Sequence, residues 1–145
     1  MMARRLVLAI AILAGLGIVV SSVSLDHHFR KSKTTYCDFG ESFNCDLVNR
    51  SEYSTLAGIP VALIGILGYA ALLTFATAYR RKGETPAILC LGALGGLGFA
   101  LYLTYVEKYI LGAWCILCLS SLAIIVSISV LAVVLVAHSR RRAES

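Results

Sequence analysis

Four long apolar segments alternate with short polar segments along the 145-residue chain. A helix crosses the hydrocarbon core of a bilayer with about 20 predominantly apolar residues. Each segment is about that long, and none contains an acidic or basic residue. The pattern predicts an all-α integral membrane protein, a four-transmembrane-helix bundle in a single domain over residues 1–145. The predicted spans are residues 6–23, 59–79, 86–106 and 114–137.

The composition supports a membrane protein. Hydrophobic residues make up 59% of the chain and charged residues 14%, whereas soluble domains contain about 45–50% apolar and about 25% charged residues. The net charge of +5 could suggest nucleic acid as a partner. The basic residues instead cluster at the ends of apolar runs, as topology signals do, without interleaved aromatic residues that would stack on bases. We therefore expect a lipid bilayer and no nucleic acid.

The basic clusters also predict the orientation. They lie at Arg4-Arg5, Arg80–Lys82 and Arg140–Arg142, so four spans would place all three on one side. That side should be cytoplasmic, because Lys and Arg are enriched in cytoplasmic segments. Both termini are then inside, and the polar loop of about residues 24–58 lies outside as a cap over the bundle.

The first apolar segment has an alternative interpretation as a cleaved signal peptide, with Arg4-Arg5 before it and Ser21–Ser24 as a cleavage zone. The hydrophobic region of a signal peptide is usually about 7–15 residues long. This apolar run is longer, which favours a retained helix.

The predicted topology sorts the five cysteines. Cys37 and Cys45 lie in the outer loop, and Cys115 and Cys118 form a C-x-x-C at the outer end of the fourth span. These four thiols face the side where disulfides persist. Cys90 lies near the inner end of the third span, about 16 residues or roughly 24 Å from the outer end. We expect Cys90 to be a small apolar side chain in helix packing.

The C-x-x-C pair has the spacing for redox chemistry. Residues three apart share a helix face, and the N-terminus of a helix stabilises a thiolate. A thiol from the aqueous side could attack such a pair, which could then reduce an apolar quinone in the bilayer. Two alternatives remain. A Cys₄ zinc site or metal transporter would use the same thiols, although seven residues separate Cys37 from Cys45, more than zinc pairs usually have. A non-catalytic subunit would use them as structural disulfides.

Three segments resemble the vitamin K epoxide reductase family, in particular its prokaryotic stand-alone members. Cys37–Cys45 followed by Ser51 resembles the loop motif of the family, and Trp114–Cys118 resembles its active-site C-x-x-C at the start of the fourth helix. Gly58–Gly65 is similar to the entry to the second helix in bacterial members. The resemblance covers nearly the whole chain, in the family's order of elements.

The resemblance implies a quinone-dependent dithiol oxidoreductase in the membrane, expected in a bacterial inner membrane. A separate thioredoxin-like or DsbA-like protein would reduce a Cys37–Cys45 disulfide, and electrons would pass to Cys115 and Cys118. The acceptor would be a ubiquinone, a menaquinone or a vitamin K type quinone, and no metal is expected. The residues implied to contact the quinone are Ser51, Val61, Cys118 and Leu122.

Overall fold

The computed structural model describes residues 2–29, 38–39, 43–44, 55–56, 58–78, 85–112 and 116–145. The described residues include four α-helices: α1 (Met2–Phe29), α3 (Val61–Thr77), α4 (Thr85–Val106) and α5 (Ile116–Glu144). A π-helical turn, η2 (Glu107–Leu111), continues α4.

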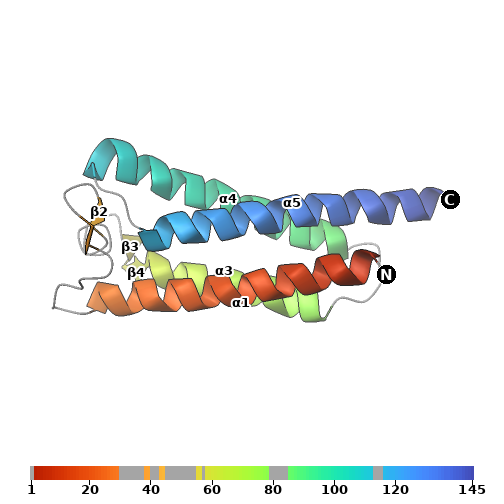
Figure 1. The fold of residues 1–145 in the computed structure, drawn as a ribbon, viewed down its shortest axis with the longest axis horizontal. Helices are drawn as coiled ribbons and strands as arrows, with labels where there is room; N and C mark the ends of the chain where they lie inside the picture. The colour runs from red at the N-terminus through yellow and green to blue at the C-terminus, as the bar shows by residue number, and fades with distance from the viewer. Residues whose placement is uncertain are drawn as a thin grey trace.

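The helices lie side by side in an elongated bundle (Figure 1). Helix α1 packs against α3 and α5, and α4 packs mainly against α5. The two termini lie at the same end of the bundle, called the termini end below. At the opposite end α1 finishes, α3 and α5 begin, and η2 lies (Figure 1). We call this the cavity end, for the cavity described in the next subsection.

The helices confirm a helical membrane protein. Three segments are long and apolar enough to cross a bilayer: Met2–Asp26, Pro86–Ile110 and Ile116–Glu144. Helix α3 is apolar but has only 17 residues, or about 25 Å at about 1.5 Å per residue. That length is at the lower limit for a crossing. The fourth transmembrane crossing therefore stays a prediction.

The helix ends differ from the predicted ones. Helix α1 continues past residue 23 to Phe29, and α3 begins at Val61 because Ile59–Pro60 forms a strand. The span predicted to end at residue 106 continues through η2, so the apolar segment contains Glu107 and Lys108. The two side chains point to different environments. The Glu107 side chain is buried, whereas Lys108 is exposed with its Nζ 5.2 Å from the ring centroid of Tyr109.

Two short hairpins are described between α1 and α3. Strands β1 (Asp38–Phe39) and β2 (Phe43–Asn44) pair antiparallel. Strands β3 (Thr55–Leu56) and β4 (Ile59–Pro60) pair in the same way. Gly58 lies in the second turn with φ of 82°, a conformation that glycine adopts without a steric penalty. The predicted cap of residues 24–58 lies largely outside the described residues.

The packed core lies toward the termini end. Helices α1, α3, α4 and α5 all contribute to it, and alanines bring the helices close together, as is common in membranes. The Ser129 hydroxyl of α5 donates to the Ile125 carbonyl at 2.7 Å and to the Ala93 carbonyl of α4 at 3.2 Å. Cys90 packs against this core, which confirms its predicted role. The core residues are Ile10, Ala14, Tyr69, Leu72, Ala76, Leu89, Ala93, Ile125, Ile128, Ala132 and Leu135.

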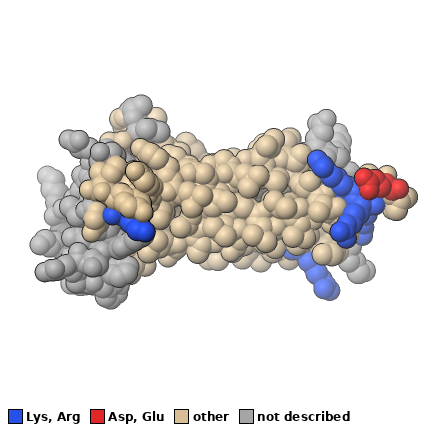
Figure 2. Space-filling view, turned by 90° about the horizontal axis from the view of Figure 1, so that it is seen from above, with Lys and Arg blue, Asp and Glu red and all other residues tan. Residues whose placement is uncertain are grey.

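Basic side chains mark the termini end. Figure 2 shows most of the described Lys and Arg side chains gathered there, with a long uncharged surface over the middle of the bundle. Arg4 and Arg5 near the N-terminus and Arg140–Arg142 near the C-terminus belong to this end. The structure thus brings two of the three predicted clusters together on one side. That this side is cytoplasmic stays a prediction.

Candidate functional site

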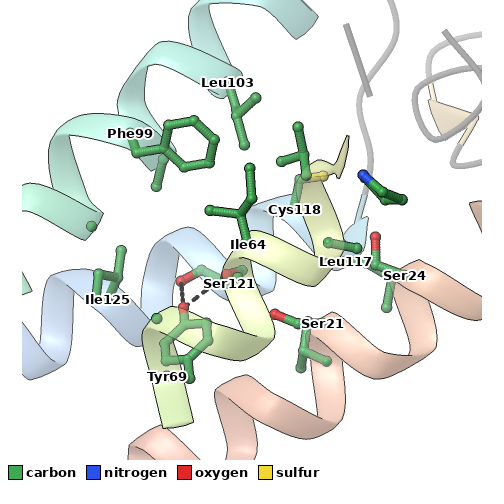
Figure 3. A pocket seen from close by; sticks show the side chains of 18 of the residues that line it. Ser21, Ser24, Ile64, Tyr69, Phe99, Leu103, Leu117, Cys118, Ser121 and Ile125 are labelled. Atoms are coloured by element: carbon green, nitrogen blue, oxygen red, sulfur yellow. Dashed lines mark hydrogen bonds between the residues drawn. The ribbon is translucent and has the colours of Figure 1, made fainter. Parts of the chain in front are cut away.

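A cavity of about 360 Å³ lies between the four helices at the cavity end. Its wall is predominantly apolar, with a few hydroxyls, one thiol and one carboxyl group. Figure 3 shows how the labelled side chains surround it. The larger apolar residues of the wall are Val20, Val61, Ile64, Leu72, Phe99, Leu103, Leu117 and Ile125.

Cys118 contributes the thiol of the cavity wall. Gly112, with φ of 63°, terminates η2 in the left-handed conformation, and α5 begins at Ile116. Cys118 therefore lies in the first turn of α5, where backbone N–H groups have no partner within the helix. Helix N-termini are a common place for redox-active cysteines. The local fold places a sulfur suited to redox chemistry in the wall of an apolar cavity.

Glycines make room for the cavity and for close helix packing. A Cβ atom added at Gly68 or Gly95 would meet nothing within 4 Å, and both residues line the cavity. A Cβ atom at Gly96 would lie 3.2 Å from Ile125 Cδ1, and one at Gly92 would lie 3.4 Å from Leu72 Cδ2. Gly92 and Gly96, which form a G-x-x-x-G, therefore allow close helix packing, and both also line the cavity.

A pair of hydroxyls lies where the cavity meets the core. The Tyr69 hydroxyl of α3 donates to the Ser121 carbonyl of α5 at 2.9 Å and lies 2.8 Å from the Ser121 Oγ (Figure 3). The Tyr69 ring is fixed against α1, because a Cβ atom at Gly17 would lie 2.5 Å from two of its atoms. Both residues line the cavity, and Tyr69 is also part of the core.

The remaining polar wall comes from α1 and η2. Ser21 and Ser24 of α1 line the cavity and are buried. Glu107, the first residue of η2, also lines it and is 2% exposed. A carboxyl group buried within a membrane segment is energetically costly and is usually retained for function. Such π-helical turns are themselves frequent at functional sites.

Only some of the predicted site residues lie in the part of the chain that the structure describes. Cys118 and Val61 line the cavity. Leu122 is not in its wall; it is half-buried and packs against the core. Cys37, Cys45, Ser51 and Cys115 lie outside the described residues. Contact of any of these residues with a quinone stays a prediction.

Tyr69 was not among the predicted site residues, nor was Ser121. Tyr69 lies within a long apolar run, so nothing in its local sequence marks it as a site residue. Its partner Ser121 is 52 residues away in the sequence. One signal was available: a tyrosine in the middle of a span needs a hydrogen-bond partner. That requirement predicts a polar partner on another span, but it does not specify which of the serines on that span is the partner.

The chain matches the model of the vitamin K epoxide reductase family over residues 8–133. This match covers most of the chain and all four α-helices in whole or in part. The protein therefore belongs to the vitamin K epoxide reductase family. Membership implies, in general terms, an integral membrane oxidoreductase that links thiol–disulfide chemistry to a quinone.

Proposed function

We propose that the protein is a membrane thiol:quinone oxidoreductase that supports disulfide-bond formation outside the cytoplasm. One observation carries the proposal beyond family membership. Cys118 lies in the first turn of α5 and in the wall of an apolar cavity of about 360 Å³. A thiol in this place can receive electrons from the aqueous side and deliver them to an apolar acceptor.

The residues of the cavity fit a quinone ring. Small-molecule sites of about 300–1,000 Å³ are typically apolar with a few convergent polar groups, and this cavity has that size and composition. Phe99, Leu103 and Ile64 provide apolar contacts for a flat ring (Figure 3). A bound quinone would supply a two-electron acceptor. Cys118, Val61 and the hydroxyls of the wall would hold it.

The register of the first hairpin supports a disulfide between the loop cysteines. Asp38 pairs with Asn44 in the antiparallel ladder. If the ladder continued by one residue, Cys37 and Cys45 would lie opposite each other. Opposed residues of antiparallel strands are about 4.5–5.5 Å apart at Cα, a separation that a disulfide spans. We infer that Cys37 and Cys45 form the disulfide that a thioredoxin-like or DsbA-like partner reduces.

The proposed relay conserves atoms and electrons. The partner dithiol reduces the Cys37–Cys45 disulfide and becomes a disulfide itself. The Cys45 thiolate attacks Cys115 of the Cys115–Cys118 disulfide, which releases Cys118 as a thiolate. Cys37 then attacks Cys45, which restores the loop disulfide and frees Cys115. Cys115 and Cys118 finally give two electrons and two protons to the quinone and return to a disulfide.

The proposed setting is a bacterial cell membrane with the cavity end outward. The basic residues at the termini end support this orientation, because they would face the cytoplasm. Ser51 completes the proposed quinone contacts. The acceptor is a ubiquinone, a menaquinone or a vitamin K type quinone.

Turnover in nanodiscs tests the proposal. Reduced thioredoxin-like protein and a quinone are added, and oxidation of the partner thiols is followed. Cys118→Ala should reduce turnover by about a hundredfold or more, because it removes a reacting atom. The matched control is Cys90→Ala, which changes a thiol in the core and should retain turnover.

Two results would contradict the proposal. One is unchanged turnover in Cys118→Ala. The other is a wild-type protein that oxidises no dithiol partner with any quinone while its outer cysteines stay reduced and retain zinc. That second result would instead support a metal site.

A further inference from the structure

We infer that the Tyr69–Ser121 pair is the binding site for the quinone oxygen that lies farther from Cys118. The Ser121 hydroxyl would donate a hydrogen bond to that oxygen, and Tyr69 would position Ser121. This inference rests on the proposed function, and it names the polar contact that orients the ring in the cavity.

The spacing along α5 fits this arrangement. Ser121 follows Cys118 by three residues, so the two share a helix face and are separated by about 4.5 Å along the helix axis. Both line the same cavity (Figure 3). A 1,4-quinone has its two oxygens at opposite ends of one ring. One oxygen can therefore lie near the Cys118 thiol while the other reaches the hydroxyl pair.

The hydroxyl proton of Ser121 can be donated to a ligand. Tyr69 and Ser121 each carry one hydroxyl proton. The Tyr69 proton can satisfy the Ser121 carbonyl at 2.9 Å or the Ser121 Oγ at 2.8 Å. If Tyr69 donates to the Oγ, the Ser121 proton can point toward the cavity while that bond stays. If Tyr69 donates to the carbonyl, turning the Ser121 proton toward the cavity gives up the bond between the two hydroxyls and keeps the carbonyl bond. When Tyr69 donates to the Oγ, the two hydroxyls form a chain that strengthens the outer hydrogen bond.

The surroundings of Tyr69 hold the pair in place. The ring is 5% exposed and lies against α1 at Gly17, which has no space for a Cβ atom. The tyrosine therefore cannot swing away from Ser121 toward α1. Ser127, by contrast, donates to the Ala123 carbonyl of its own helix at 2.9 Å. Ser121 faces the cavity and has a hydroxyl partner on another helix.

Infrared spectroscopy of bound quinone tests the contact directly. The probe is 2,3-dimethyl-1,4-naphthoquinone with both carbonyl carbons ¹³C-labelled, so that an isotope difference spectrum separates its bands from those of the protein; full substitution of the quinone ring prevents thiols from adding to it. In the full-length protein in nanodiscs, we expect a carbonyl band shifted to lower frequency by a hydrogen bond. Ser121→Ala should abolish the shifted band, and Ser121→Thr should restore it. Tyr69→Phe should broaden and weaken it, because Ser121 loses its fixed partner.

Kinetics provide a second readout. Ser121→Ala should raise the KM for this quinone by about three- to tenfold, the equivalent of one hydrogen bond. Oxidation of partner thiols in a single turnover without quinone should be unchanged. The matched controls are Ser127→Ala on the same helix and Tyr102→Phe on an exposed helix face. Neither should change the band or the KM.

The outcomes separate this inference from the proposed function. An unchanged carbonyl band in Ser121→Ala, with quinone turnover present in wild type, overturns the inference alone. The pair would then only join α3 to α5, and Tyr69→Phe would lower the unfolding temperature without affecting the band. Absence of quinone turnover in wild type would instead overturn the proposed function.

Discussion

The two ends of the bundle are built from the same helices but packed in opposite ways. Toward the termini end, alanines and branched side chains such as Ile10, Ile128 and Leu135 are packed with 0% exposure. Toward the cavity end, glycines and widely spaced side chains leave about 360 Å³ open. Because an apolar void forfeits dispersion contacts, the open end costs stability that the packed end must provide. We interpret the termini end as the scaffold and the cavity end as the reaction site.

Some residues between the two ends belong to both regions. Tyr69, Leu72 and Ile125 belong to both the core and the cavity wall. A change in the scaffold should therefore affect stability first, and a change in the cavity wall should affect quinone use first.

The largest effect is expected in the scaffold. Ile128→Ala removes a side chain that is 0% exposed, and such a truncation costs about 2–5 kcal/mol of stability. Thermal unfolding in detergent measures the loss, while the KM for quinone should not change. Val130→Ala is the control on the same helix, because Val130 is 57% exposed and faces lipid. An equal loss of stability in both variants would contradict the assignment of the scaffold.

A smaller effect is expected from filling the cavity. Gly95 lines the cavity, and a Cβ atom added there would meet nothing within 4 Å. The substitution Gly95→Leu should therefore place its side chain in the cavity. The KM for quinone should rise by about tenfold, which corresponds to about 1.4 kcal/mol of lost binding. Stability should be retained, because the added Cβ atom meets no neighbour within 4 Å and the rest of the side chain can enter the cavity.

The control for the filled cavity is Gly98→Leu. Gly98 is on the same helix and also has no atom within 4 Å of an added Cβ, but it is not in the cavity wall. If Gly98→Leu raised the KM as much as Gly95→Leu, the effect would come from the helix and not from the cavity.

The smallest effect is expected at the Ser129 hydrogen bond to α4. Ser129→Ala removes the 3.2 Å bond to Ala93, and interhelical hydrogen bonds in membranes contribute about 0.6 kcal/mol. Unfolding in graded denaturing detergent measures this difference. Ser127→Ala, which loses only a bond within its own helix, should be less destabilised; the reverse order would contradict an interhelical role for Ser129.

The sequence predicted the helices better than it predicted their ends. Long apolar runs identify helices because every backbone polar group in lipid must be satisfied within the segment. The end of the third span was misplaced because Glu107 and Lys108 suggest an aqueous boundary. The structure instead continues the helix through η2 and buries Glu107 while Lys108 stays exposed.

The site was predicted where chemistry depends on local spacing. The C-x-x-C pointed to Cys118, and the structure places Cys118 in the cavity wall; its redox role stays a prediction. The Tyr69–Ser121 pair depends on two helices meeting at one height, which the periodicity of either helix alone does not specify. The cavity depends on which glycines face inward, and Gly95 and Gly98 show that neighbouring glycines can differ in this respect.

The most direct test of the central claim follows quinol formation without any partner protein. Chemically reduced protein in nanodiscs is freed of reductant, mixed anaerobically with quinone, and monitored by stopped-flow absorbance. We predict two quinols per chain in wild type and in Cys90→Ala, because each of the two reduced cysteine pairs holds two electrons, and none in Cys118→Ala. Quinol formation at the wild-type rate in Cys118→Ala would contradict the claim that Cys118 delivers the electrons to the cavity.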